Sequence, residues 1–138
     1  RELMQLFTIG LVELNADGTP RAGADGRPIE TYGPQDVLGL AKVFTGFSWA
    51  SATRADAHFF TGDDMATRDV RPMVGYPRWH AQDAKTFLGV TCPAGAAPEQ
   101  SLKCALDRLF AHPNVGPFVG RQLIQRLVTS NPSPAYVG

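Results

Sequence analysis

Hydrophobic positions repeat with a helical period in four parts of the chain, and the first covers residues 1–9. Leu3, Leu6 and Phe7 recur there at helical spacing. Gly10 follows, and glycine commonly ends a helix because it tolerates the left-handed conformation. This pattern predicts the end of a buried helix.

A second helical pattern begins at Pro34. Proline suits the first position of a helix, and Asp36 places a negative charge near the positive end of the helix dipole. Gly46 ends the pattern. Apolar residues at i, i+3, i+4 and i+7 predict one stripe that faces the core. The stripe consists of Val37, Leu40, Ala41 and Phe44.

Two further helical patterns occupy the last third of the chain. Pro98 suits a helix start, and His112-Pro113 breaks the helix after Ala111. An imidazolium at His112 is expected to interact with the last carbonyls of that helix. The next pattern ends at residues 130–134, which are rich in proline. The apolar positions are Leu102, Ala105, Leu106 and Leu109 in one helix, and Val115, Phe118, Val119, Leu123, Ile124, Leu127 and Val128 in the other.

Residues 11–32 have a different pattern, which predicts a small β-hairpin insert or a β-meander. Asp17-Gly18 and Asp25-Gly26 are near copies of one turn. Asp-Gly favours a type I′ turn, in which both central residues have positive φ. Pro20 and Pro28 restrict strand pairing to edges.

Residues 47–97 show no sustained period, so we expect a long irregular segment there. Such a segment is uncommon in a compact domain and is often functional. The sequence therefore predicts a mainly α fold of three to four helices, with a small β-hairpin insert and a long irregular segment, in a single domain over residues 1–138. The aromatic residues of this segment include Trp49, Phe59, Phe60, Tyr76, Trp79 and Phe87.

Composition limits the choice of partner. The 13 basic and 13 acidic residues cancel, so the chain lacks the basic field that a nucleic-acid-binding protein needs. Charged residues make up 19% of the chain, below the usual value of about 25%, which suggests that another surface normally covers part of this one. No apolar run approaches the length of a membrane span. Because the chain enters a helical pattern at once, without an initiator Met, we expect a fragment of a longer protein.

Several motifs follow one another in a fixed order along the chain: Arg1–Gly10, Tyr32–Val37, Phe44–Phe47, Trp79-His80, Lys85–Gly89, His112–Asn114 and the stretch to Pro134. Together they resemble the bacterial family called domain of unknown function DUF1800. The resemblance implies a longer, mostly helical and usually exported protein, with no agreed reaction. Genes of the family often neighbour those of an exported sulfatase-like family, which implies a partner protein. Many members carry an acid directly after the histidine, whereas Ala81 follows His80 here.

Cys92 and Cys104 are the only cysteines. In a reducing cytosol they would be two buried apolar side chains. Since the family resemblance implies export, we expect them to form a disulfide. Two cysteines without clustered histidines do not complete a structural zinc site.

His58 and His80 lie in the irregular segment among several aspartates. Such a mixture can bind a metal or act as acid and base, but an Asp-rich loop more often caps its own turns. We therefore predict no metal and no cofactor. A carbohydrate-stacking platform is a second alternative for this segment, and it would use Trp49, Trp79, Tyr76 and Phe87. The aspartates are Asp56, Asp63, Asp64, Asp69 and Asp83.

Three weak candidates for catalysis are Glu2, His80 and Lys85. Glu2 lies on an otherwise apolar helix, where a carboxylate can form a buried ion pair, anchor the helix end or act as a catalytic group. Lys85 can bind an anionic group beside His80, or pair with Glu2 or Asp83. Nucleophile-elbow, dinucleotide and P-loop motifs are absent from the sequence.

Two functions follow from these observations. The first is a structural or protein-interaction module of an exported bacterial protein, located in the periplasm or otherwise exported. Its partners would be the exported sulfatase-like protein and the remainder of its own chain. The alternative is a hydrolase that acts on an envelope polymer or ester, with His80, Lys85 and Glu2 in one cleft. The sequence does not decide whether the protein is an enzyme.

Overall fold

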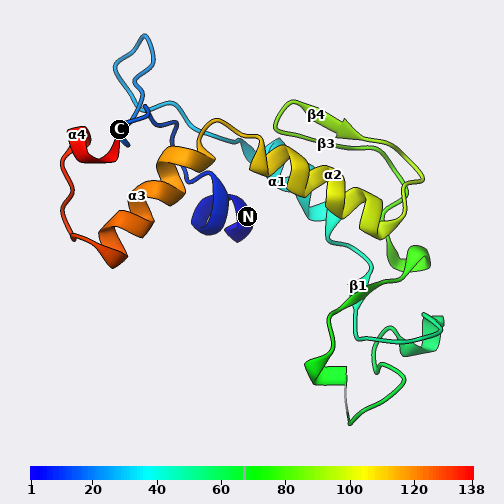
Figure 1. Ribbon diagram of the computed structural model, residues 1–138. Helices are drawn as coiled ribbons and strands as arrows, with labels where there is room; N and C mark the ends of the chain where they lie inside the picture. The colour runs from blue at the N-terminus through cyan, green and yellow to red at the C-terminus, as the bar shows by residue number, and fades with distance from the viewer. Residues whose placement is uncertain (67) are drawn as a thin grey trace. The chain divides into compact units, whose positions relative to one another are not determined.

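The computed structural model describes residues 1–66 and 68–138, and over these residues the chain is mostly helical (Figure 1). The mainly α fold is therefore confirmed. Three main helices and two small two-stranded sheets occur in this part of the chain. The main helices are α1 (Pro34–Val43), α2 (Pro98–Phe110) and α3 (Val115–Leu127), and α4 (Pro134–Val137) is a short fourth helix. The strands are β1 (Phe47–Ser48), β2 (Val74–Gly75), β3 (Lys85–Phe87) and β4 (Val90–Cys92).

The chain forms two compact units. The first consists of Arg1–Pro34 and Leu106–Gly138, and the second of Gln35–Ala105. None of the helices in the described ranges combines the length and the apolarity that a bilayer crossing requires.

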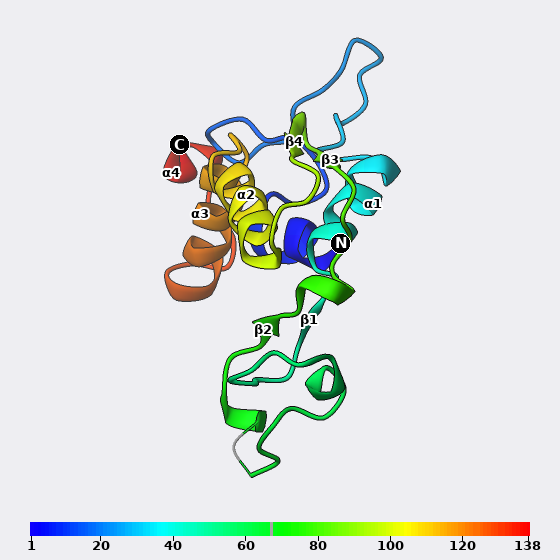
Figure 2. The same cartoon turned by 90° about the vertical axis from the view of Figure 1, so that its right-hand side faces the viewer.

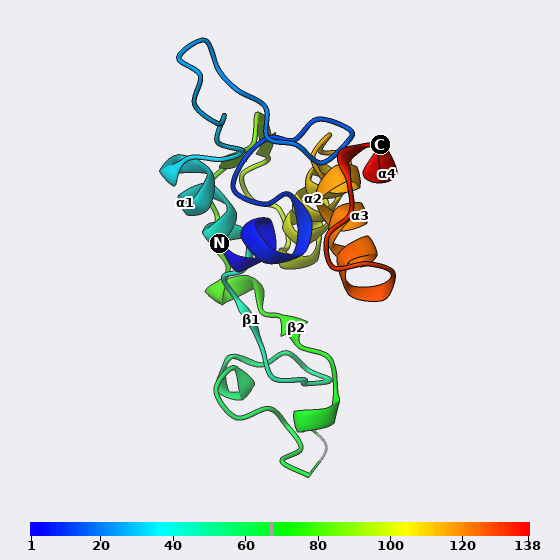
Figure 3. The ribbon, with the colours of Figure 1, turned by 90° about the vertical axis from the view of Figure 1, so that its left-hand side faces the viewer.

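The first unit contains a short π-helix, η1 (Leu3–Thr8), which packs against α3 (Figure 3). Gly10 has φ +69°, and a Cβ atom there would lie 2.6 Å from the Phe118 ring. A glycine is thus required both by the backbone conformation and by the close approach of α3.

The prediction of a buried helix over residues 1–9 is correct only in part. Met4 and Ile9 are fully buried, but Leu6 and Phe7 are 50% and 68% exposed. One side of η1 is therefore apolar and open to solvent.

Asn114 holds the start of α3 to the segment that follows η1. Its side-chain amide donates to the carbonyls of Ile9 and Val12, at 2.6 and 2.9 Å, and its Oδ1 accepts from the Leu14 N–H at 2.6 Å. The side chain is 3% exposed. A buried amide with three backbone partners fixes this segment without the need for a strand.

The insert over residues 11–32 consists of two tight turns with isolated β-bridges rather than strands. The predicted type I′ turns are wrong. Gly18 and Gly26 have φ near +75°, but Asp17 and Asp25 do not have positive φ. Each aspartate instead accepts a hydrogen bond from the backbone N–H two residues later, as Asx turns do.

In the second unit, α1 packs on the backbone of β3. A Cβ atom on Gly39 would lie only 1.8 Å from the Thr86 carbonyl oxygen. The buried positions of α1 are Gly39, Leu40 and Val43. The predicted stripe is therefore wrong at Ala41 and Phe44, which are exposed. The helix contacts β3 through Gly39, which has no side chain, and this contact sets which side of α1 is buried.

A type I′ turn does occur, at Leu88-Gly89 between β3 and β4. Both residues have positive φ, +46° for Leu88 and +76° for Gly89. This conformation is costly for leucine. Two contacts offset the cost: the Leu88 side chain is only 7% exposed, and the Leu88 N–H donates to Asp36 Oδ1 at 2.6 Å.

β1 and β2 pair at the base of the segment that runs from Trp49 to Met73 (Figure 2). Tyr76 follows β2 and is fully buried. Its hydroxyl donates to the Trp49 carbonyl at 2.7 Å. The predicted irregular segment thus contains all four named strands, and two short 3-10 helices, Asp56–His58 and Arg68–Val70, lie between β1 and β2.

Candidate functional site

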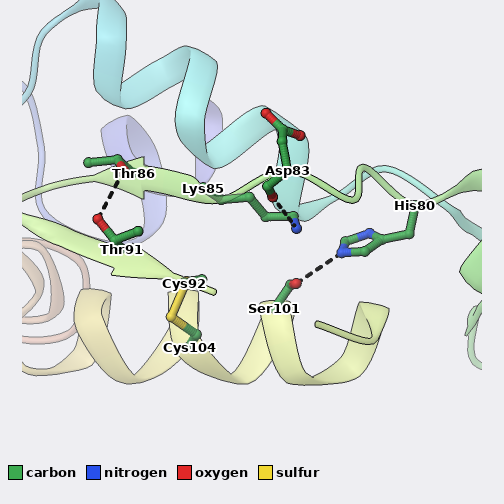
Figure 4. The surroundings of a disulfide bond; sticks show 8 residues. All are labelled: His80, Asp83, Lys85, Thr86, Thr91, Cys92, Ser101 and Cys104. Carbon is green, nitrogen blue, oxygen red and sulfur yellow. Dashed lines mark hydrogen bonds between the residues drawn. A yellow bond between two sulfur atoms is a disulfide. The ribbon is translucent and has the colours of Figure 1, made fainter. Parts of the chain in front are cut away.

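Three of the polar side chains that are buried in the second unit gather beside the disulfide (Figure 4). They are His80, which follows the 3-10 helix Pro77–Trp79, Lys85 on β3 and Ser101 in the first turns of α2. Lys85 pairs with Cys92 in the antiparallel ladder. One helix, one hairpin and one loop therefore supply this cluster, which we call the His80 cluster.

Hydrogen bonds on both sides fix the His80 imidazole. Its Nδ1 lies 2.8 Å from the Thr45 carbonyl oxygen, and its Nε2 lies 2.9 Å from Ser101 Oγ. A carbonyl oxygen only accepts, so Nδ1 carries the proton. In the neutral imidazole, Nε2 is then the acceptor and the Ser101 hydroxyl donates to it.

This order of hydrogen bonds is also the one in which an imidazole removes a proton from a serine nucleophile. The arrangement differs from a catalytic one in how accessible the serine hydroxyl is to a substrate. Ser101 is fully buried and His80 is 3% exposed, so a substrate cannot reach the hydroxyl in this conformation. The pair here ties α2 to the loop that contains His80.

Lys85 is fully buried. Its ammonium donates to the Asp83 carbonyl oxygen at 3.1 Å. The Asp83 carboxylate pairs instead with the Lys42 ammonium. The Lys42 side chain is the main reason why the pKa of Asp83 lies below its ordinary value. The predicted pairing of Lys85 with Asp83 therefore involves the backbone and not the carboxylate.

Cys92 and Cys104 form a disulfide, as expected, with their Cα atoms 6.1 Å apart. The bond joins the end of β4 to α2. Cys104 lies one helical turn after Ser101, so the same side of α2 carries both residues. The crosslink holds that side of the helix against the β3–β4 hairpin.

Glu2 belongs to the first unit, and its side chain is 72% exposed. Its carboxylate lies 4.0 Å from the amino group of Arg1. The structure thus brings His80 and Lys85 into one cluster and places Glu2 in another part of the chain.

A second cluster of polar side chains lies in the segment between β1 and β2. Ser51 Oγ is 3.0 Å from His58 Nδ1, and Asp63 Oδ2 accepts from the Ala52 N–H at 2.5 Å. That backbone bond is the main cause of a lowered pKa at Asp63, and the Ser51 hydroxyl contributes. The serine lies between the histidine and the aspartate. A catalytic triad needs the histidine in the middle, so this arrangement stabilises the turn.

Within residues 1–66 and 68–138, no three His, Cys, Asp or Glu side chains are grouped so that they could hold a metal ion.

The carbohydrate platform of Trp49, Trp79, Tyr76 and Phe87 does not form. Tyr76 and Phe87 are core residues with at most 1% exposure. The Arg68 guanidinium covers the Trp49 ring at 4.9 Å. Trp79 stacks on Phe59, with ring centroids 4.7 Å apart.

Sequence reasoning did not identify Ser101 or Thr45. The available signal for Ser101 was its spacing of three residues from Cys104, which places both on one side of α2. Thr45 contributes its backbone carbonyl, and a carbonyl carries no signal in the residue type.

Comparison with known proteins identifies a family but no activity. Residues 1–138 match the family described as Protein of unknown function (DUF1800). No curated protein and no solved structure matches the chain.

Proposed function

The chain belongs to the DUF1800 family, and since that family is described only as being of unknown function, we propose from the structure that the chain is a protein-interaction module. The proposed interaction surface lies on the first unit. It consists of the exposed apolar side chains of η1 and of the end of α3, and we call it the α3 surface. Its residues are Leu6, Phe7, Leu123, Leu127 and Val128.

Exposure of these side chains is the observation that carries the proposal. Leu123 and Leu127 are 54% and 78% exposed, and they lie one turn apart on the same side of the helix. None of the residues of α3 is fully buried, although its sequence has a clear apolar stripe. Exposed apolar groups that gather on adjacent elements are typical of interaction sites.

The charges of α3 indicate the chemistry of the partner. Arg121 and Arg126 are the only charged residues of Val115–Leu127. We therefore infer a protein partner with an apolar patch whose edge carries Asp or Glu side chains, since complementary charge speeds association and excludes wrong partners.

The disulfide supports an oxidising compartment, because such bonds are rare in a reducing cytosol. We propose export to the periplasm or beyond. An exported sulfatase-like protein and the remainder of the module's own chain are the proposed partners, and both are tested by the experiment that follows.

Photo-crosslinking in an extract of the export compartment tests the α3 surface. Benzoylphenylalanine replaces Leu127, and the matched control carries it at Val70, which is 83% exposed in the second unit. We expect crosslinks from position 127 to one protein, through an apolar peptide flanked by acidic residues. The substitution Leu123→Asp should abolish them.

Equal crosslinking from positions 127 and 70 would contradict the proposal, as would crosslinks from position 127 that survive Leu123→Asp. A crosslink to a second copy of the chain would show that the partner is the chain itself, which also contradicts an acid-edged partner.

The second candidate is a hydrolase acting on an envelope polymer or ester. One observation favours it: the hydrogen-bond order Ser101–His80–Thr45 carbonyl suits proton removal from the serine. It requires an opening motion, because both side chains are buried. Labelling with a fluorophosphonate that is lost in Ser101→Ala would support the hydrolase, and the absence of labelling would support the interaction module.

A further inference from the structure

A pocket in the first unit lies between the segment that follows η1 and one side of α3. Its volume is about 270 Å³. An enclosed cavity of about 150 Å³ accepts benzene, whereas drug-sized ligands occupy about 300–1,000 Å³. The pocket therefore has room for one ring, or for a short branched chain, together with a small polar group. Its apolar lining residues are Leu11, Val12, Leu14, Pro20 and Phe118.

Hydrogen bonds fix the backbone on one side of the pocket to the residues of α3 and of its start. Asn114 Oδ1 accepts from the Leu14 N–H, and the Asn114 amide group donates to the Val12 carbonyl. Farther along the segment, Arg121 Nη1 donates to the Gly18 carbonyl at 2.8 Å. The walls of the pocket are thus held in place without a ligand, so binding does not have to order this segment.

The polar side of the pocket consists of three residues of α3, namely Arg121, Gln122 and Gln125. Among the described residues that line the pocket, only Arg121 is charged. Over residues 1–66 and 68–138, its hydrogen-bond partner is the neutral Gly18 carbonyl, and no carboxylate forms an ion pair with it. A guanidinium has five N–H donors in a planar fork that matches a carboxylate. One bond to a carbonyl therefore leaves donors, and the positive charge, for a ligand.

We propose that this pocket binds a small carboxylic acid, with its carboxylate on the Arg121 guanidinium and its apolar ring or chain against Leu14 and Phe118. The side-chain amides of Gln122 and Gln125 have N–H groups that can donate to the same carboxylate. The ligand needs both parts, because the charge is bound by one side of the pocket and the apolar group by the other.

The pocket is separate from the α3 surface. At 3.6 residues per turn, Leu123 and Leu127 lie about 140° and about 180° around the helix from Phe118. A ligand in the pocket therefore leaves these two side chains free for a partner protein. The carboxylate site goes beyond the proposed interaction function, and the failure of either proposal does not decide the other.

Amide NMR of the full chain, with phenylacetate as the probe, tests the site. Phenylacetamide has the same ring without the charge, benzylamine has the opposite charge, and acetate has no ring. We expect phenylacetate to cause saturable shifts at the backbone amides of Leu14 and Gln122. Phenylacetamide should bind about tenfold or more weakly, and benzylamine and acetate should not saturate. N-acetylphenylalanine resembles the end of a peptide, and whichever of the two acids binds more tightly identifies the source of the carboxylate as a peptide end or a free acid.

Three variants complete the test. Arg121→Gln should weaken the binding of phenylacetate by about tenfold or more. The matched change Arg27→Gln should leave it unaltered, because the Arg27 side chain is 86% exposed at a turn. Gln122→Lys adds a second positive charge to the pocket and should tighten binding several-fold, a gain that misfolding cannot produce. Equal binding of phenylacetate and phenylacetamide, equal effects of the two arginine variants, or shifts that do not saturate with either acid would overturn the proposal.

Discussion

Reduction of the Cys92–Cys104 disulfide should destabilise the protein, mainly through its effect on the unfolded chain. The bond joins residues that are 12 positions apart. For a loop near this length, the loss of chain entropy on crosslinking corresponds to about 3 kcal/mol at 25 °C. That is a large share of the roughly 5–15 kcal/mol that stabilises a typical domain.

The expected shift in melting temperature follows from the size of the cooperative unit. At about 2.1 cal/mol/K per residue, the 138 residues have an unfolding entropy of roughly 0.29 kcal/mol/K. A loss of 3 kcal/mol then lowers Tm by about 10 °C if the chain unfolds as the single domain that the sequence predicts. If Gln35–Ala105 unfolded alone, its transition would fall by about 20 °C.

Scanning calorimetry of oxidised and reduced protein measures this shift. The control is the double variant Cys92→Ala/Cys104→Ala, in which reductant should have no effect. Two free thiols in unreduced protein, or an unchanged Tm after verified reduction, would refute the reasoning and remove the support for an oxidising compartment.

Three further predictions concern buried contacts, and urea unfolding measures each of them. Gly39→Ala should destabilise the protein by about 1–3 kcal/mol, because the new methyl group meets the Thr86 carbonyl oxygen. The matched change Gly120→Ala, where nothing lies within 4 Å, should be neutral or stabilise the protein by up to about 1 kcal/mol. Equal effects of the two substitutions would contradict the close packing at Gly39. Asn114→Ala should cost about 3 kcal/mol or more, since three backbone groups lose their hydrogen bonds to the buried amide. A cost below about 1 kcal/mol would show that water replaces the amide. Lys85→Met should leave the stability of the fold unchanged or raise it, because the ammonium is fully buried and its hydrogen bond goes to a backbone carbonyl. A clear loss of stability would show that the charge is paired.

The helices could be predicted from the sequence because their signals are local. The starts of α1 and α2 at proline and the break at His112-Pro113 depend on residues that act within one turn. The buried side of α1 could not be predicted in the same way. Periodicity counts apolar side chains, whereas Gly39 contacts β3 because it has none.

The turns could also be predicted only where the residues that determine them are local. The sequence predicts turns at Asp17-Gly18 and Asp25-Gly26, and the structure has turns there, because aspartate and glycine act locally. The type I′ turn formed at Leu88-Gly89 instead, and a leucine with positive φ gives no local signal. The Leu88 N–H donates to the carboxylate of Asp36, and Asp36 is 52 positions away in the sequence.

The candidate site could be predicted in part. His80 and Lys85 lie in one cluster (Figure 4), and their spacing of five residues in the sequence was the reason to consider them together. Their partners are the Ser101 hydroxyl and two backbone carbonyls, and neither the pairing nor the burial that closes the site can be read from residue type. The Asp-rich segment behaved as expected, with Asp63 and Asp64 accepting backbone hydrogen bonds.

The yield of crosslinks from benzoylphenylalanine at position 127, measured together with Tm in two variants, tests the central claim most directly. Leu123→Asp changes the α3 surface, and Ser101→Ala changes the His80 cluster. We expect Leu123→Asp to abolish the crosslinks and to leave Tm unchanged, because the Leu123 side chain is exposed. Ser101→Ala should lower Tm, because His80 loses a buried hydrogen bond, and should leave the crosslinks intact below the new Tm. Two results together would contradict an interaction module at the α3 surface: loss of the crosslinks in Ser101→Ala with an unchanged Tm, and their survival in Leu123→Asp. They would indicate that the His80 cluster carries the function instead.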